Sequence, residues 1–280
     1  MVMRFLKKTY VFLIFAFLYA PILVLIVFSF NESKSRANWE GFTLKWYYEL
    51  FKDRHIMSAL YYTLLIAVLS SVIATLIGII ASIGIFHMKK VPQGVVLNLN
   101  YIPILNPDIV TGISLMVLFI FMKMNLGFVT MLLAHITFNI PYVILSILPK
   151  LKQMNKHLYE AALDLGATPA EAFRKVILPE IMPGVITGFL LAFTLSLDDF
   201  VISFFTTGSG VTNLSIVIFG MARRGISPKI NALSTLMFVS VLILLIIVNI
   251  RMSKDNPERR ARIERSKENS RYLPDIGHDI

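Results

Sequence analysis

The 280-residue sequence contains no cysteine, and only 16% of its residues are charged. Without cysteine the chain can form no disulfide, no thiol nucleophile and no Cys-ligated metal site. It also lacks the Gly-x-x-x-x-Gly-Lys-Ser/Thr loop that cradles nucleotide phosphates, so we do not expect it to hydrolyse ATP or to carry a cofactor of its own. Apolar residues, by contrast, make up 56% of the chain, and the mean hydropathy is +0.71. These values indicate an all-α integral membrane protein rather than a soluble globule.

Six apolar stretches are long enough to cross a bilayer, because each reaches the roughly 20 residues that a membrane-spanning helix needs. They cover residues 10–30, 57–86, 95–122, 128–148, 184–205 and 230–250. The first follows a basic N-terminus but is too long for the apolar core of a secretory leader. We therefore expect it to be retained, and the sequence predicts six transmembrane helices.

The distribution of Lys and Arg predicts the orientation of these helices. With both termini in the cytoplasm, the inner segments hold 18 of the 27 basic residues: three at the N-terminus, two after the second span, five after the fourth and eight in the tail. This bias favours an N-in, C-in arrangement. The net charge of +10 then follows from topology and needs no nucleic-acid partner. Residues 1–252 form the expected transmembrane domain, and residues 253–280 an expected disordered cytoplasmic tail.

A polar segment, residues 150–183, separates the fourth and fifth apolar stretches and begins with a short amphipathic helix. Its apolar positions recur at i, i+3, i+4 and i+7 and share one helical face. They are Leu158, Ala161, Ala162 and Leu165. A helix that lies in lipid usually carries Lys and Arg around its polar face, whereas this one carries Glu160 and Asp164. The pattern favours a protein partner for this helix over a lipid surface.

A second short helix is predicted directly after the first. Gly166 supplies the backbone freedom for a helix stop and a sharp turn. Residues 168–171, Thr-Pro-Ala-Glu, form a full start signal with a capping threonine, a proline at the first helical position and a glutamate three residues after the cap. Pro179 and Pro183 are expected to end this helix.

This segment resembles the cytoplasmic loop of ABC importer permeases, in which Glu-Ala-Ala, three residues, Gly, nine residues and Ile-x-Leu-Pro follow one another. Val176 replaces the isoleucine, and the other six positions match: Glu160, Ala161, Ala162, Gly166, Leu178 and Pro179. The resemblance implies that the loop docks into a cleft on an ATPase subunit. We expect these six residues and Leu165 to couple the permease to that ATPase.

Three carboxylates fall inside apolar stretches. Asn106-Pro107-Asp108 predicts a break in the third stretch, with Asn106 as helix cap and Asp108 in the first turn of a new helix. Asp198 and Asp199 are adjacent in the fifth stretch, where neighbouring side chains of one helix point about 100° apart. Helix rise places all three carboxylates roughly 20 Å from the inner boundary.

No span contains a Lys or Arg at this depth to neutralise the three carboxylates. A buried charge in a membrane is costly, and a cationic substrate would supply the missing charge. We therefore predict that Asp108, Asp198 and Asp199 lie along a substrate pathway. The alternative is structural: one carboxylate caps a helix, one pairs with a basic residue and one reaches the outer interface.

The fourth stretch carries His135 and Asn139, which share one helical face. Hydrogen bonding between helices is the favoured interpretation for polar residues at such positions. No second histidine or carboxylate follows at metal-ligand spacing, so no metal site is predicted.

Further segments resemble the C-type (PotC) membrane subunits of spermidine/putrescine importers: residues 19–22, 29–31, 107–110, 135–138 and 196–199. The resemblance implies a type I importer fold that forms half of a polyamine pore in a bacterial inner membrane. It also implies a second homologous permease, two ATPases that hold ATP and magnesium, and an external polyamine-binding protein.

Other functions remain as alternatives. Related permeases for ferric iron or sulfate share the same scaffold, so the substrate could be another solute. A secondary transporter usually shows internal repeats with matched broken segments, but the sequence predicts only one broken span. A membrane-embedded enzyme would place a cluster of histidines or carboxylates near an interface, whereas the candidates here are scattered and deep.

Overall fold

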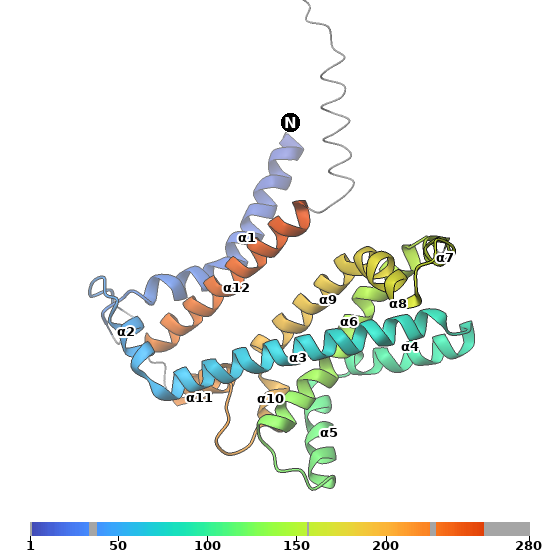
Figure 1. The fold of residues 1–280 in the computed structure, drawn as a ribbon. Coiled ribbons are helices and arrows are strands. Elements are labelled where there is room, and N and C mark those ends of the chain that lie inside the picture. Colours follow the sequence, from blue (N-terminus) through green and yellow to red (C-terminus); the bar gives the residue numbers. More distant parts are fainter. Residues whose placement is uncertain (1, 34–37, 156, 225–227, 255–280) are drawn as a thin grey trace, which may run out of the picture. The chain divides into compact units, whose positions relative to one another are not determined.

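In a computed structural model the chain is helical, with one isolated antiparallel pairing between Asn31 and Phe42 (Figure 1). The structure describes residues 2–33, 38–155, 157–224 and 228–254. Backbone contacts divide the chain into two units, Met1–Leu233 and Ser234–Ile280. The functional features described below all lie in the first unit. The predicted tail of residues 253–280 lies outside the described residues apart from its first two.

The expected apolar stretches correspond to helices, although not always to one helix each. The long helices are α1 (Val2–Phe28), α3 (Arg54–His87), α6 (Phe128–Gln153), α9 (Leu178–Asp198) and α12 (Pro228–Lys254). A bent pair, α4 (Lys90–Leu105) and α5 (Asp108–Phe121), covers the third stretch. The short helices are α2 (Lys45–Lys52), α7 (His157–Asp164), α8 (Pro169–Ala172), α10 (Val201–Thr206) and α11 (Leu214–Arg224).

Four helices of the described chain are long and apolar enough to cross a membrane, or five if the bent pair counts as one span. The four begin at residues 6, 54, 128 and 169, which match the first, second, fourth and fifth predicted stretches. The sixth stretch lies within α12, whose described apolar part, Pro228–Ile243, is shorter. The all-helical membrane class is therefore confirmed, at four to five candidate spans.

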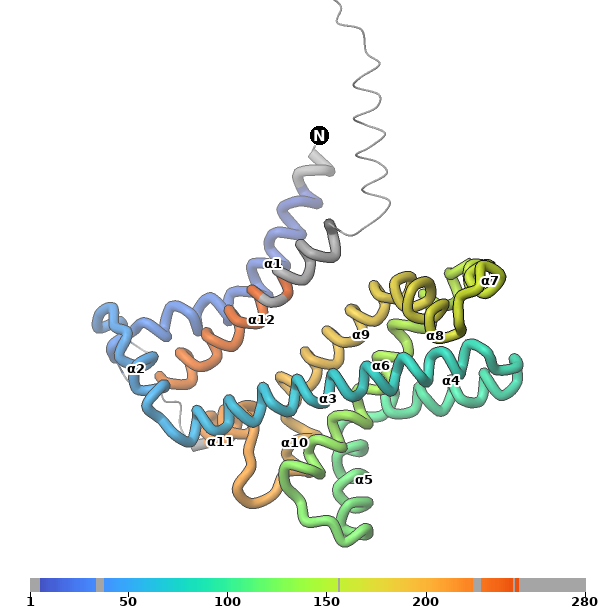
Figure 2. Tube along the Cα trace, viewed as in Figure 1, coloured from blue at the N-terminus to red at the C-terminus, as the bar shows by residue number. Residues whose placement is uncertain are grey.

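The core of the first unit is formed where α3, α6 and α9 pack along one another, as the trace in Figure 2 shows. Glycine allows the close approach of α9 to α6. A Cβ on Gly184 would lie 2.7 Å from the carbonyl oxygen of Ser146, and one on Gly188 would lie 3.2 Å from the Cα of Val143. Small residues at helix contacts are typical of membrane proteins, where close packing replaces the hydrophobic effect as a driving force.

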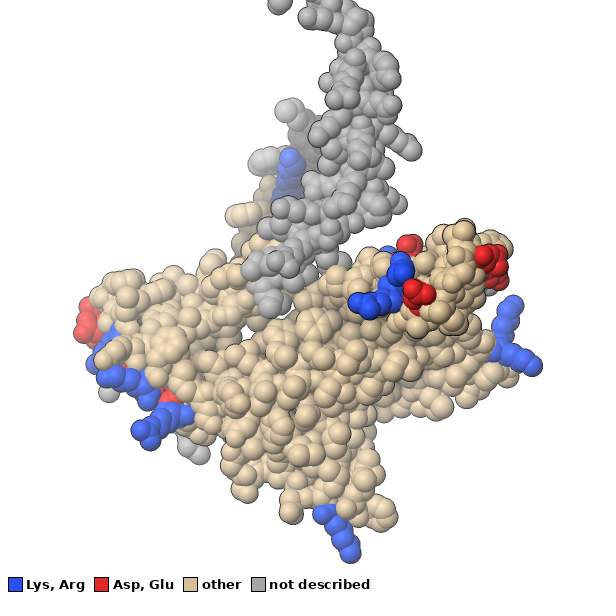
Figure 3. Space-filling model, viewed as in Figure 1, with Lys and Arg blue, Asp and Glu red and all other residues tan. Residues whose placement is uncertain are grey.

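The outer surface of α3 and α4 is apolar. On the face drawn in Figure 3, Lys, Arg, Asp and Glu gather near the helix ends, and the surface between carries none. Both helices carry exposed large apolar side chains: Leu76, Ile80, Val91, Val95 and Leu99. Such a belt is what a lipid-facing surface requires.

The break predicted in the third stretch is confirmed, because α4 and α5 meet at a 105° bend. The role expected of Asn106 is wrong, however. Asn106 ends α4, where its N–H donates to the Ile102 carbonyl at 3.1 Å, and Pro107 occupies the position before α5 without a side-chain cap. The residue before a proline is forced into an extended conformation, which Asn106 adopts with ψ 143°. Asp108, predicted in the first turn of the new helix, lies there as the first residue of α5, and Pro107 precedes the helix instead of beginning it.

The helix that starts at Pro169 does not end at the two prolines. It passes through one π-helical turn, η1 (Phe173–Ile177), and continues as α9. The N–H of Leu178 donates to the carbonyl of Phe173, five residues back, and Pro179 then falls in the first turn of α9, where its missing N–H is tolerated. Ile177 and Ile181 pack into the core with Ile147, and this burial favours a continued helix.

The fifth stretch is interrupted, and the prediction of one helix over residues 184–205 is wrong. Helix α9 ends at Asp198, and α10 begins at Val201. Asp199 between them has an extended backbone with ψ 125°, and its carboxylate accepts N–H groups of the new helix. An aspartate that caps a helix competes with the backbone hydrogen bonds of a continuous helix. Asp199 is therefore the residue at which the helix is interrupted.

Candidate coupling surface and pathway carboxylates

The loop between α6 and α9 is built around Gly166. Helix α7 ends before this glycine, whose φ of +85° lies in the left-handed region. The N–H of Gly166 donates to the Leu163 carbonyl at 2.9 Å, and the N–H of Ala167 donates to the Ala162 carbonyl at 3.1 Å. These bonds close the end of α7 and confirm the predicted helix stop at a glycine.

Helix α8 begins with the predicted capping box. The Thr168 hydroxyl accepts the N–H of Glu171 at 3.3 Å, and the Glu171 carboxylate accepts the N–H of Thr168 at 3.1 Å. Lys175 adds an ion pair to Glu171 at 3.2 Å. The hydrogen bond from the Thr168 backbone, followed by the contact with Lys175, lowers the pKa of the Glu171 carboxyl to about 2.

The side chains assigned to coupling divide into an exposed group and an anchoring group. Leu165 is 89% exposed, Leu158 is 42% exposed, and Glu160 lies 3.3 Å from the neighbouring His157. Ala161 and Pro179 are also exposed, whereas Ala162 is half-buried. Leu178 instead packs against the core shared by α6 and α9. The structure thus presents an apolar and acidic surface on α7, and the loop lies apart from the α9–α10 break (Figure 1).

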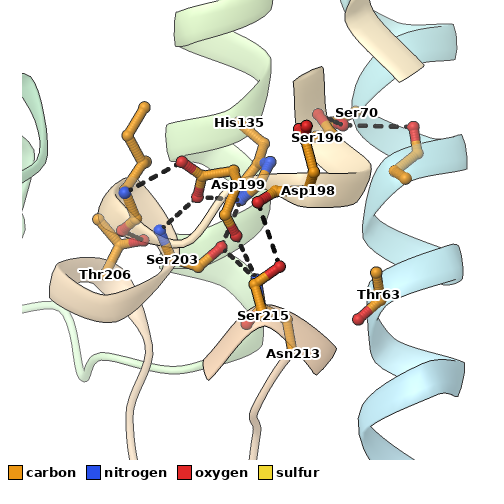
Figure 4. Close-up of polar contacts among 12 residues, drawn as sticks. Thr63, Ser70, His135, Ser196, Asp198, Asp199, Ser203, Thr206, Asn213 and Ser215 are labelled. Carbon is orange, nitrogen blue, oxygen red and sulfur yellow. Dashed lines mark hydrogen bonds and ion pairs between the residues drawn. The ribbon is translucent and has the colours of Figure 1, made fainter. Parts of the chain in front are cut away.

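The adjacent carboxylates of the fifth stretch occupy different environments (Figure 4). The Asp199 side chain is 9% exposed and accepts the N–H groups of Ile202 at 3.2 Å and Ser203 at 2.7 Å. The Asp198 side chain is exposed, and only its backbone carbonyl is bonded, to the Ser215 hydroxyl at 3.2 Å. Asp108 is also exposed, at the start of α5, and α5 packs against α10.

His135 and Asn139 of α6 both make contacts between helices, as the sequence predicted. His135 is 2% exposed, and its Nε2 lies 2.9 Å from the Ser203 hydroxyl and 3.6 Å from Asp199 Oδ2. Asn139 is fully buried and donates to the Ser196 hydroxyl at 2.7 Å. His135 thus holds α10, and Asn139 holds the last turns of α9.

Two partners in this region were missed by reasoning from sequence. Asn213 donates to the Asp199 carbonyl at 2.8 Å and to the Ser203 hydroxyl at 2.7 Å, and it caps α11 through Ile216. Its position before an apolar run is a helix-start signal that could have identified it. Thr63 accepts the N–H of Leu214 at 2.8 Å from α3, and nothing local in the sequence marks that contact.

Among the described residues, no group of three or more His, Cys, Asp or Glu side chains could hold a metal ion. The side chains of His135, Asp199, Ser203 and Asn213 at the α9–α10 break all take part in hydrogen bonds. Two carboxylates near the interruptions, Asp108 and Asp198, are left exposed.

The chain was compared with known protein families. Residues 74–254 match the family model described as "Binding-protein-dependent transport system inner membrane component". The chain is 40% identical over 246 residues to the spermidine/putrescine transport system permease protein PotC of Escherichia coli K12, which covers 88% of this chain and 93% of that protein. It is also 40% identical over 261 residues to the putrescine transport system permease protein PotI of the same strain, covering 90% and 92%.

Solved structures share the fold at low identity. A chain of a bacterial ABC transporter involved in the import of the acidic polysaccharide alginate aligns with a TM-score of 0.69 at 15% identity, over 91% of this chain and 96% of that chain. A chain of the MetNI methionine ABC transporter aligns with a TM-score of 0.58 at 15% identity, over 76% and 98%. The fold of ABC importer permeases is therefore present in this chain.

Proposed function

Because this chain belongs to the family of binding-protein-dependent transport inner membrane components, we propose that it forms half of the membrane pathway of an ATP-driven polyamine importer. The substrate class is supported by identities of 40% to permeases named for spermidine and putrescine, over about nine-tenths of the chain. The shared fold alone would not carry this assignment, since an importer of an acidic polysaccharide has it too.

The proposed topology is that of a type I importer permease with six spans and both termini inside. The bent pair α4–α5 is taken as the third span, α12 as the sixth, and residues 1–252 as the membrane domain. Non-helical backbone at membrane depth is tolerated only where it is buried in protein or lines a watery cavity. The two interruptions, at Pro107 and at Asp199, are therefore assigned to the pathway side of the subunit.

The proposed partners are a second homologous permease in the same lipid bilayer, two ATPase subunits on the cytoplasmic side and an external polyamine-binding protein. The exposed apolar face of α7, with Leu165 at 89% exposure, is assigned to a cleft on the ATPase. Closure of the ATPases upon ATP binding would then move α7 and, through the anchored Leu178, the core of α6 and α9.

The observation that carries the substrate assignment in the structure is the exposure of Asp108 and Asp198. No candidate span contains a basic side chain near either residue in sequence, and neither carboxylate takes part in an ion pair described for this chain. A carboxylate at membrane depth faces the pathway and needs a cationic partner. The separated ammonium groups of a polyamine would supply this cationic partner while the substrate moves along the pathway.

The proposal is tested by uptake of labelled spermidine and putrescine into bacteria that lack this subunit, with and without the chain restored. Restored polyamine uptake, without a change in uptake of ferric iron or sulfate, is the expected result. Restored uptake of ferric iron or sulfate instead would show that the substrate of this permease is not a polyamine. An ATPase that co-purifies with the chain separates an ABC importer from a secondary transporter.

A further inference from the structure

We propose that His135 is a positioning residue, which holds the break between α9 and α10 so that Asp199 stays inside the protein and Asp198 faces the pathway. This inference rests on the proposed function of Asp198 in polyamine transport. His135 itself would touch no substrate, because it is 2% exposed.

The first step of the argument is the role of Asp199. Its two carboxylate oxygens accept the N–H groups of Ile202 and Ser203, at 3.2 and 2.7 Å, so the side chain caps α10. A helix N-terminus carries partial positive charge, which favours a carboxylate at this place. The capped geometry requires Asp199 to leave the α9 helix, and its backbone is extended there.

The cap alone does not explain why the carboxylate stays inside. The Asp199 side chain is 9% exposed, and a buried carboxylate is stable only where it is paired and hydrogen-bonded. His135 supplies that partner from α6, with Nε2 at 3.6 Å from Asp199 Oδ2 and 2.9 Å from the Ser203 hydroxyl. With its proton on Nε2, the ring donates to the Ser203 hydroxyl, and the same N–H group lies beside the carboxylate.

Asn213, just before α11, also holds the α9–α10 break. It donates to the backbone carbonyl of Asp199 and to the Ser203 hydroxyl, and it caps α11. The Ser203 hydroxyl is thus hydrogen-bonded both to His135 of α6 and to Asn213 at the start of α11. In Figure 4 these side chains converge on the break, while Asp198 belongs to the last turn of α9 and its side chain lies outside this set of contacts.

The two neighbouring carboxylates therefore have different roles. Without the break, consecutive residues of one helix would point about 100° apart, and neither would be held in a defined direction by the other. With the break fixed by His135, Asp199 is used to build the turn, and Asp198 is left exposed at the end of a packed helix. Loss of His135 should therefore alter the environment of Asp198, although the two side chains make no described contact.

The absence of cysteine allows a direct test of this positioning that does not depend on the substrate. In the full transporter complex, Asp198→Cys is treated with a membrane-impermeant cationic thiol reagent and the rate of labelling is measured. His135→Leu should slow this rate about tenfold, the scale expected when a buried partner is lost, and His135→Gln, which retains an N–H donor, should restore most of it. An unchanged rate in His135→Leu would overturn the inference.

Thr130→Val is the matched control. Thr130 is also buried on α6 and also bonds α10, through the Thr206 carbonyl at 2.8 Å, but at the end of α10 remote from the break. It should leave labelling at Asp198→Cys unchanged. If Thr130→Val slows labelling as much as His135→Leu does, the effect is a general loosening of α10, and His135 has no special role.

A double-mutant cycle then connects the positioning to transport. His135→Leu should raise the KM for spermidine uptake about tenfold in the wild-type background and have little further effect in an Asp198→Asn background, since it acts through that carboxylate. Equal KM increases in both backgrounds would overturn the inference. If Asp198→Asn leaves uptake unchanged while His135→Leu still alters labelling, the positioning stands and the proposed pathway role of Asp198 fails.

Discussion

The coupling loop and the α9–α10 break are both helix interruptions, but they are held by different kinds of contact. In the loop, every bond around Gly166 and Thr168 joins residues within five positions of each other. At the break, Ser203 is bonded to a histidine 68 residues away and to an asparagine on the next helix. The loop is a local motif that a sequence pattern can reveal. The break is a tertiary structure, held by residues of α6, of α10 and of the segment just before α11.

The two regions also differ in what they leave unsatisfied. The loop exposes an apolar side chain, Leu165, whose burial against a partner would be favourable. The break satisfies its own polar groups and exposes one charge, Asp198. The loop is thus suited to binding a protein, and the break to meeting a small cation.

The largest effect on uptake is expected from Gly166→Pro, which disrupts the turn between α7 and α8. Proline fixes φ near −65° and has no N–H, whereas this position has φ +85° and donates to Leu163. Uptake should fall to background while the protein is inserted at the wild-type level, and Glu160→Lys should act in the same direction by reversing charge on the docking surface. Gly94→Ala, at a helical glycine with open space around it, is the control and should transport normally.

Normal uptake by Gly166→Pro at wild-type expression would remove the loop from the mechanism. The loop would then have no role in transport, and coupling to the ATPase would have to pass through another cytoplasmic segment. Quantitative immunoblotting of membranes, alongside the uptake assay, separates this outcome from a failure of insertion.

Leu165→Asp should release the ATPase from the detergent-solubilised complex. The side chain is almost fully exposed in the isolated chain, so the change should not disturb folding, but a charge cannot be buried in an apolar cleft without cost. Leu165→Met keeps the apolar contact and should retain the ATPase. If the ATPase remains bound to Leu165→Asp while transport is lost, the loop transmits motion and the affinity comes from elsewhere.

Neutralising the carboxylates tests the other region. Asp198→Asn should raise the KM for polyamine about tenfold without blocking assembly, as expected when one charge-assisted hydrogen bond is removed. Asp199→Asn should instead reduce the amount of assembled complex, because the buried cap loses its charge beside His135. Asp108→Asn should give a mixed result, since Asp108 is exposed but also begins α5. Uptake kinetics and complex yield, measured together, distinguish the three.

If all three variants import polyamine at the wild-type rate, charge at these positions does not guide the substrate. If Asp198→Asn lowers the yield of assembled complex and leaves the KM normal, Asp198 has the structural role that is assigned here to Asp199. Either result would contradict the contrast between an outward and an inward carboxylate.

The difference between the two regions also explains how far the sequence could be interpreted. The four to five candidate spans, the break at Pro107, the glycine stop and the capping box were predictable because hydropathy, proline and capping act over a few residues. The helix through Pro179 was not, because burial of Ile177 and Ile181 against α6 outweighs the local cost of a proline. The break after Asp198 was not predictable either. Whether an aspartate caps a new helix depends on partners such as His135 and Asn213 that are distant in sequence.

The smallest effect is expected from Glu171→Gln in the capping box. Glutamine still accepts the Thr168 N–H and loses only an exposed ion pair with Lys175, and exposed pairs contribute little, so uptake at pH 7 should stay within about twofold of wild type. The pKa of Glu171 is lowered from 4.5 to about 2, so its contribution to the folded loop is complete above pH 4.5 and declines only as pH falls toward 2. Retention of the ATPase should therefore show no inflection due to this residue between pH 8 and pH 5. An inflection there that Glu171→Gln abolishes would mean that the carboxylate titrates in a different environment once the loop is docked.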